Sequence, residues 1–277
     1  MVQNMKTLYI SDLDGTLLQS SQCTSDFTNE TINQLVRDGM LFSYATARSF
    51  ITASKVTKGL NAEIPVITYT GAMIINNKDG SVMLDNYFGE EVHGIIDDLL
   101  QHDIYPIVYA MVDGQEKMSF VASKMSRGVQ DFVDSRQNDP RIRPAESVDA
   151  LHNGTAFYIT CIDEKGKLTE LYKKYQNQFH CIFQVDIYSK EQWLEILPKC
   201  VSKAHAIKQL MEYYKCNHLV VFGDGKNDID MFEMADEAYA VANAVPELKK
   251  IATSVIGGNN KDGVAKFLVE RFNKLKM

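Results

Sequence analysis

Short apolar runs alternate with amphipathic segments near both ends of the chain. The apolar runs are bounded by polar residues and cover residues 8–10, 41–45, 65–69 and 219–223. The amphipathic segments cover residues 49–60, 204–214 and 229–234. Short apolar runs are typical of buried strands, and a 3.6-residue period is typical of helices. The pattern therefore predicts an α/β fold with a Rossmann-like, doubly wound parallel-sheet core.

The middle of the chain has a different pattern. Helices are expected there at residues 90–101, 125–137 and 167–176, and strands at 105–110, 117–121, 155–162 and 181–187. Helices mixed with antiparallel strands indicate a separate α+β domain inserted into the first one. We therefore expect residues 1–84 to form the first part of the core, residues 85–187 the inserted domain, and residues 188–277 the rest of the core.

Two carboxylates follow the first apolar run. Asp12 and Asp14 stand two positions apart, so on an extended backbone their side chains leave on the same face. Carboxylates this close repel, and one pKa rises unless a cation lies beside them, for which a metal ion is the simplest solution. The alternative is a plain turn, because Asp14-Gly15 is a common turn dipeptide.

Polar side chains also follow other predicted strands. Asp224 and Asp228 come after the run at 219–223, with glycines that let a ligand approach the backbone. Thr46 and Arg48 follow the run at 41–45, where a hydroxyl, backbone N–H groups and a helix start could hold an anion. Lys203 opens a predicted helix. Each residue alone is more often a helix cap or a solvated side chain, but their order along the chain points to one site.

With these stretches in this order, the chain resembles the haloacid dehalogenase (HAD) superfamily, and in particular the Cof-type phosphatases with a C2 cap (subclass IIB). These enzymes act on sugar phosphates and other small phosphorylated metabolites. The resemblance rests on DLDGTLL (12–18), ATAR (45–48), Lys203 and GDGKND (223–228), with further similar stretches at 240–244 and 261–265. Three departures concern substrate identity: Thr70 where Asn is usual, Cys200 where Gly is usual, and Ala204-His205 where Gly-Thr is common.

The resemblance implies a phosphatase that hydrolyses phosphomonoesters through an aspartyl-phosphate. Asp12 would be the nucleophile, and Asp14 would protonate the leaving oxygen and then deprotonate the attacking water. Thr46, with the neighbouring backbone at Ala47, would hold phosphoryl oxygens. Lys203 would balance charge on both the nucleophile and the phosphate.

The resemblance also implies magnesium as cofactor. Mg²⁺ would bind the Asp12 carboxylate, the Asp14 backbone carbonyl and Asp224, with Asp228 either a further ligand or a partner of one. An all-oxygen set suits Mg²⁺ and is poor for zinc.

Several other side chains have two interpretations. Asn227 contacts phosphate or metal-bound water, or else caps a helix, and Arg48 pairs with substrate or braces the cap. His205 is expected to be a half-exposed helical residue and Trp193 to pack in a strand. Four bases of the inserted domain either hold the far end of a substrate or form solvated surface: Lys124, Arg127, Arg141 and Arg143.

Composition narrows the functional class. The formal net charge of −7 argues against nonspecific binding to nucleic acid. The five cysteines are scattered and form no Cys-x-x-Cys pair, so neither a disulfide framework nor a zinc site is indicated. No apolar run reaches the roughly 20 residues that span a bilayer, and the first residues lack a signal-peptide pattern. We expect a cytoplasmic enzyme whose partner is a small phosphorylated metabolite, with no nucleic acid, membrane or protein partner.

Two further functions remain open. One is a phosphomutase resembling the phosphomannomutases, which would return the phosphoryl group to a sugar. The other is a noncatalytic module that accepts phosphate on Asp12, but such a module has no use for the general acid/base Asp14. Release of phosphate, as against formation of an isomer, would separate a phosphatase from a mutase.

Overall fold

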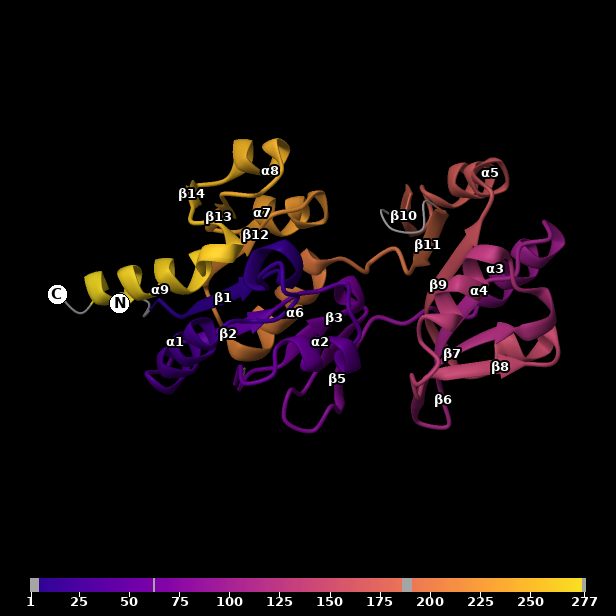
Figure 1. Ribbon diagram of the computed structural model, residues 1–277, viewed down its shortest axis with the longest axis horizontal. Coiled ribbons are helices and arrows are strands. Elements are labelled where there is room, and N and C mark those ends of the chain that lie inside the picture. The colour runs from indigo at the N-terminus through magenta and orange to yellow at the C-terminus, as the bar shows by residue number, and fades with distance from the viewer. Residues whose placement is uncertain (1–4, 62, 186–190, 276–277) are drawn as a thin grey trace. The chain divides into compact units, whose positions relative to one another are not determined.

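The chain forms two compact units. The structure is a computed structural model that describes residues 5–61, 63–185 and 191–275. Unit 1 combines residues 1–85 with residues 202–277, and unit 2 comprises residues 86–201. In Figure 1, unit 1 holds the indigo start and the yellow end of the chain, and unit 2 holds its magenta and salmon middle.

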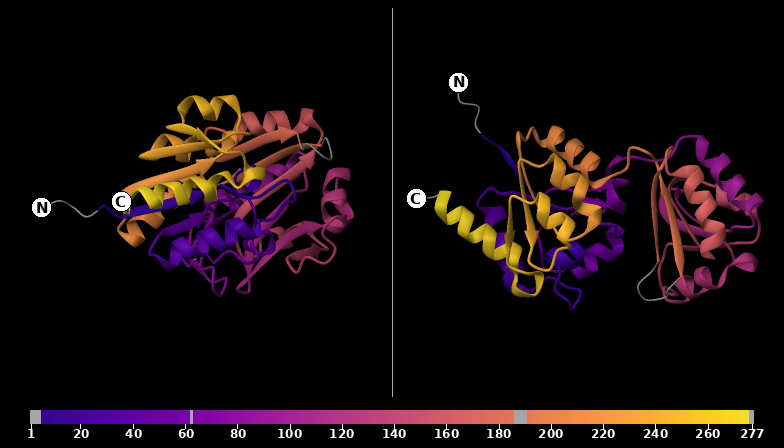
Figure 2. Two further views of the ribbon diagram at one scale, coloured as in Figure 1. Left: turned by 60° about the vertical axis from the view of Figure 1, so that its left-hand side comes forward. Right: turned by 90° about the horizontal axis from the view of Figure 1, so that it is seen from above.

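Unit 1 is built on a parallel sheet with the strand order β14-β13-β12-β1-β2. The strands are β1 (Thr7–Ser11), β2 (Leu41–Tyr44), β12 (His218–Gly223), β13 (Glu237–Val241) and β14 (Ser254–Ile256). β1 lies between β2 and β12, and Ser11 is in register with Phe222. The central strands are buried along nearly all of their length because helices cover both faces of the sheet, as Figure 2 shows.

The helices of unit 1 form two groups. α1 packs beside α9, whereas α7 packs beside α6 and α8. Their bounds are α1 (Asp26–Arg37), α2 (Phe50–Val56), α6 (Lys203–Tyr214), α7 (Ile229–Met234), α8 (Pro246–Ile251) and α9 (Gly263–Leu275). Short turns are η1 (Leu13–Leu17), η2 (Tyr69–Gly71), η5 (Lys226–Asp228) and η6 (Asn259–Lys261).

A small antiparallel sheet completes unit 1. It contains β3 (Val66–Thr68), β4 (Met73–Ile75) and β5 (Val82–Asp85). A parallel bridge between Ala45 and Ile67 places β3 beside the end of β2. The carboxyl ends of β12, β1 and β2 and the end of β3 therefore lie along one edge, where ligands of such sheets bind.

Unit 2 is an α+β domain. Its sheet has the order β10-β11-β9-β6-β7-β8 and is antiparallel except between β7 and β8. The strands are β6 (Ile107–Val112), β7 (Gln115–Val121), β8 (Ile142–Ala145), β9 (Thr155–Asp163), β10 (His180–Val185) and β11 (Gln192–Leu197). The helices are α3 (Glu91–Gln101), α4 (Arg127–Asp134) and α5 (Lys165–Tyr175), with short turns η3 (Ala122–Lys124) and η4 (Val148–His152).

The predicted fold class is confirmed, and the two units divide the chain after residues 85 and 201. The boundary expected after residue 84 lies within a residue of the one observed, whereas residues up to 201 belong to unit 2 rather than to the core. The reason is β11, which pairs with β10 on one side and β9 on the other. The expected boundary at 187/188 and the expected end of the strand at 181–187 lie outside the described residues.

In the part of the chain that the structure describes, no helix is both long and apolar enough to cross a bilayer.

Candidate active site

Three carboxylates meet at the carboxyl ends of β1 and β12. The Asp12 N–H donates to the carbonyl of Phe222 at 2.9 Å, which joins the chain after β1 to the end of β12. Asp12, Asp224 and Asp228 each offer an oxygen, and these oxygens lie within 4.8 Å of one another. The structure thus brings together three residues that the sequence pattern assigned to one site.

A buried ammonium joins two of the carboxylates. Lys203 is the first residue of α6, and its Nζ lies 2.5 Å from Asp12 Oδ1 and 2.7 Å from Asp228 Oδ1. The Lys203 and Asp228 side chains are fully buried and that of Asp12 is 6% exposed. Ions removed from water to this degree are tolerated only when they are paired and hydrogen-bonded, as these are.

The charges of the cluster do not balance. Burial raises the pKa of the Asp12 carboxyl, and the Lys203 ammonium opposes this rise. Burial alone would lower the pKa of Lys203, but the negative charges of Asp12 and Asp228 outweigh it and hold this pKa above its ordinary value. One ammonium thus faces three carboxyl groups, and a further cation would bring the pKa of Asp12 down again.

The loop after β12 is held by its own carboxylate. Asp228 Oδ2 accepts hydrogen bonds from the N–H groups of Asp224 and Gly225, both at 3.0 Å. Thr16 Oγ1 donates to Asp224 Oδ1 at 2.9 Å. Burial raises the pKa of Asp224, and the Thr16 hydrogen bond opposes this. All oxygens of Asp228 are therefore engaged by protein donors, whereas Asp224 Oδ2 faces Gly15.

Gly15 is required by this close approach. Its φ is 80°, and a Cβ on it would lie 2.3 Å from Asp224 Oδ2. Its carbonyl accepts a hydrogen bond from Asn243 Nδ2 at 2.7 Å. Thr16 and Asn243 were not predicted as site residues, although both lie in stretches, 12–18 and 240–244, that the sequence singles out.

Thr46 lies at the carboxyl end of β2, as predicted. Its N–H donates to the carbonyl of Ile67 at 3.0 Å, and its Oγ1 accepts from the Arg48 N–H at 3.1 Å. The Thr46 side chain is buried, and Ala47, next to it, is exposed. A hydroxyl at a buried loop with an exposed neighbour is suited to holding an anion.

Arg48 has a partner that neither interpretation of the sequence included. Its Nε and Nη2 donate to the two carboxylate oxygens of Asp14 at 2.7 and 2.6 Å. The Asp14 side chain is 52% exposed, so it remains open to solvent on its other side. The guanidinium pairs in this bidentate form because its planar fork matches a carboxylate.

Asn227 does not cap a helix. α7 begins after Asp228, which occupies its N-cap position, while Asn227 lies exposed in η5. Its Oδ1 lies close to the backbone of Gly225, since a Cβ on Gly225 would be 2.4 Å from this oxygen. The contact with phosphate or metal-bound water stays a prediction.

Two bases of unit 2, Arg141 and Arg143, bond to protein groups, which neither of their two interpretations from the sequence included. Arg141 is not solvated surface, because its buried guanidinium donates to Asp139 Oδ2 at 2.6 Å and to Glu116 Oε1 at 2.8 Å. Arg143 Nη1 donates to Ser119 Oγ at 3.0 Å and to the carbonyl of Ala150. Charged side chains are buried where such partners are available, and the partners of Arg141 lie on different strands and loops. The Trp193 ring packs against the Phe132 ring with 5.5 Å between the ring centroids, as expected for a strand residue.

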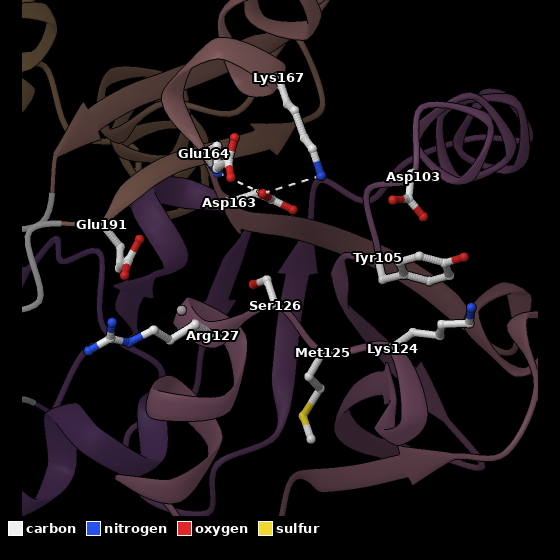
Figure 3. A pocket seen from close by; sticks show the side chains of 11 residues that line it. Asp103, Tyr105, Lys124, Met125, Ser126, Arg127, Asp163, Glu164, Lys167 and Glu191 are labelled. Atoms are coloured by element: carbon white, nitrogen blue, oxygen red, sulfur yellow. Dashed lines mark hydrogen bonds and ion pairs between the residues drawn. The ribbon is translucent and has the colours of Figure 1, made fainter.

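Lys124 and Arg127 do line a pocket, which Figure 3 shows. The pocket lies within unit 2 and has a volume of about 490 Å³. Lys124 lies 5.4 Å from the centre of the Tyr105 ring, and Lys167 lies 3.7 Å from Asp163. Acidic and basic side chains thus share this pocket.

Comparison with known proteins identifies the family of the chain. A family model described as haloacid dehalogenase-like hydrolase matches residues 9–268. A Bacillus subtilis protein, 5-amino-6-(5-phospho-D-ribitylamino)uracil phosphatase YitU, is 24% identical over 282 residues, which cover 95% of this chain and 96% of that protein. A second B. subtilis protein with the same activity in its name, YwtE, is 26% identical and covers 95% of this chain and 97% of its own length.

Solved structures share the architecture. The crystal structure of TM0651 from Thermotoga maritima superposes with a TM-score of 0.76, at 26% identity and with 97% of each chain covered. A structure from Eubacterium rectale, at 19% identity, has a TM-score of 0.81 over 96% of this chain and 98% of that one, which concerns the fold alone. The family match spans nearly the whole sequence, and the chain therefore belongs to the haloacid dehalogenase-like hydrolases.

Proposed function

We propose that this protein is a Mg²⁺-dependent phosphatase that hydrolyses small phosphomonoesters through an aspartyl-phosphate on Asp12. The observation that carries the proposal is the buried Lys203 ammonium bonded to Asp12 and Asp228 beside Asp224. Phosphoryl transfer depends on in-line placement and on positive charge near the transferring group. The Lys203 ammonium and a cation held by the carboxylates would supply the positive charge, and Asp12 would supply the attacking oxygen.

The donor set fits magnesium. The three side chains offer only carboxylate oxygens, and Mg²⁺ prefers hard oxygen ligands. Asp12, Asp224 and the carbonyl of Asp14 would hold it, while Asp228, already engaged by Lys203 and two N–H groups, would hold the loop in place. When bound, the ion supplies positive charge that the phosphoryl oxygens need in the transition state.

The residues of the chain would act in two steps. In the first, an Asp12 carboxylate oxygen bonds to phosphorus while the bond from phosphorus to the substrate oxygen breaks, and Asp14 gives that oxygen a proton. In the second, a water bonds to phosphorus after losing a proton to Asp14, and the bond to Asp12 breaks. Thr46 and the neighbouring N–H groups would hold phosphoryl oxygens, and Lys203 would orient Asp12 and compensate its charge.

Arg48 adds a requirement to the first step. Its Nε and Nη2 donate to both carboxylate oxygens of Asp14, and the acid step needs one of these oxygens to face the leaving oxygen instead. Asp14 must therefore leave Arg48, at least in part, before it acts as an acid. The exposed position of Asp14 leaves room for that movement.

Substrate choice is assigned to unit 2 in this proposal. The residues that act on phosphate or metal all belong to unit 1, so they cannot distinguish one leaving group from another. The mixed charges of the pocket in Figure 3 suit a polar metabolite. Arg127→Glu, at a side chain 87% exposed, should then change the ranking of substrates by kcat/KM without affecting all of them equally.

The test is phosphate release from a panel of phosphorylated metabolites, including 5-amino-6-(5-phospho-D-ribitylamino)uracil, which the names of two relatives give as their substrate. Asp12→Asn should abolish release, while the same change at the exposed Asp26 should not. Formation of an isomeric phosphate without release would favour the mutase. Release by Asp12→Asn at the wild-type rate, with folding verified by circular dichroism, would overturn the proposal.

A further inference from the structure

The turn η2 has an unusual backbone. Tyr69, Thr70 and Gly71 follow one another with φ values of 49°, 56° and 107°. Glycine adopts such angles freely, but a β-branched residue such as threonine does so rarely and at a cost in conformational energy. Backbone of this kind persists where the surrounding structure enforces it, and it is concentrated at functional sites.

The surroundings of η2 explain how it is enforced. The Tyr69 N–H donates to the carbonyl of Arg48 at 3.0 Å, and the Thr70 N–H donates to the carbonyl of Thr46 at 2.9 Å. On its other side, a Cβ on Gly71 would lie 2.2 Å from the carbonyl oxygen of Ser202. The turn is therefore held between the loop proposed to bind phosphate and the residue that precedes Lys203.

The Thr70 side chain has an unused hydroxyl. The residue is 5% exposed, and its Oγ1 is buried with no hydrogen-bond partner among the described residues. Buried hydroxyls are nearly always hydrogen-bonded, because an unpaired one loses its contacts with water without replacement. A strained backbone and an unpaired donor thus occur at one residue. The backbone N–H of that residue donates a hydrogen bond to the carbonyl of Thr46.

We propose that Thr70 contacts the substrate, its hydroxyl donating a hydrogen bond to an oxygen of the phosphoryl group that Thr46 holds. The inference rests on the proposed function and adds a residue to its phosphate site. Bound phosphate would supply the acceptor that the buried hydroxyl lacks. The Thr70–Thr46 backbone bond would keep the two hydroxyl-bearing residues side by side.

The test compares Thr70→Val, which removes the hydroxyl but keeps the branched shape, with Thr70→Ser, which keeps the hydroxyl. Thr68→Val is the matched control, since Thr68 is also buried with an unpartnered hydroxyl but has an extended backbone with a φ of −121°. A hydrogen bond to a charged group corresponds to about a tenfold to hundredfold change in affinity. We therefore expect Thr70→Val to raise the inhibition constant of inorganic phosphate and lower kcat/KM for every substrate by that factor. Thr70→Ser and Thr68→Val should stay within about threefold of wild type.

Two results would overturn the inference while leaving the phosphatase proposal intact. One is a Thr70→Val enzyme that binds phosphate as wild type does, and the other is an equal loss in Thr70→Ser, which would assign the effect to shape. If wild-type protein hydrolysed no substrate, the proposed function would fail first. Calorimetric titration with inorganic phosphate and Mg²⁺ would then still compare the variants, and a wild-type protein that bound no phosphate would overturn both.

Discussion

Replacing Lys203 with methionine should destabilise unit 1 severely. The substitution keeps the length of the side chain but leaves the buried carboxylates of Asp12 and Asp228 without their shared ammonium. Removing one partner of a buried ion pair costs about 3–5 kcal/mol. For a domain of this size each kcal/mol lowers Tm by about 2–4 °C, so a fall of roughly 6–20 °C is expected. Thermal unfolding followed by circular dichroism in the presence of a chelator measures it.

The loss should depend on pH and on metal. Without the ammonium, burial leaves the pKa of Asp12 above its unfolded value, so the folded state binds more protons and stability falls as pH rises. The defect should therefore be larger at pH 8 than at pH 5. Mg²⁺ should restore part of the stability, because it binds the folded state and brings positive charge to Asp12.

Lys208→Met is the matched control for this experiment. Lys208 lies on the same helix, α6, but is exposed, and such a substitution should change stability by no more than about 0.5 kcal/mol. Adding Asp228→Asn to Lys203→Met should recover part of the loss, because one uncompensated charge is removed. If Lys203→Met unfolded at the same temperature as Lys208→Met at pH 8, the ammonium would not be compensating these carboxylates and the reasoning would be refuted.

Three other outcomes are expected. Asp14→Asn should slow turnover by about 10²–10⁴-fold, and by less for p-nitrophenyl phosphate, whose leaving group needs little protonation; equal losses for good and poor leaving groups, with the first step rate-limiting, would contradict the acid role. Chelation should abolish phosphate release, Mg²⁺ should restore it and excess Ca²⁺ should inhibit it, because the larger ion accepts more ligands; turnover that survives chelation would exclude the metal. Hydrogen bonds from Arg271 lower the pKa of Glu237 to about 2, so its contribution to stability is complete above about pH 4.5 and is lost as pH falls through about 2. Glu237→Gln should lower the stability of unit 1 at pH 7 by about 1–2 kcal/mol, after allowance for solvent screening, and flatten the acid limb of its stability curve.

Much of the site could be predicted from the sequence because its residues occupy positions that the topology itself brings together. Asp12 and Asp224 each follow a strand directly, and parallel strands end at one edge of the sheet. The Arg48–Asp14 pair could not be predicted, since it depends on the conformations of two loops and of a long side chain. The unpaired hydroxyl of Thr70 could not be predicted either, because the amino-acid sequence does not specify the φ value of this residue.

Strand pairing limited the prediction of the domain boundary. β11 is recognisable as a strand from its residues, but its partner β9 lies on the other side of α5 and β10 in the chain. Local patterns of apolar residues do not specify such a partner. Arg141 shows the same limit for charges, because its burial depends on Glu116 being brought near it by the sheet.

The order of the strands has a consequence for how the protein is made. β1 is synthesised before the whole of unit 2 and its neighbour β12 after it, and the Lys203–Asp12 bond spans 191 residues. Until β12 is synthesised, one edge of β1 lacks its strand. Unpaired edges of apolar strands associate with other chains. A chain that stops before residue 218 therefore carries an intact sequence for unit 2 but an aggregation-prone half of unit 1, so premature termination is expected to yield insoluble protein rather than a weakly active enzyme.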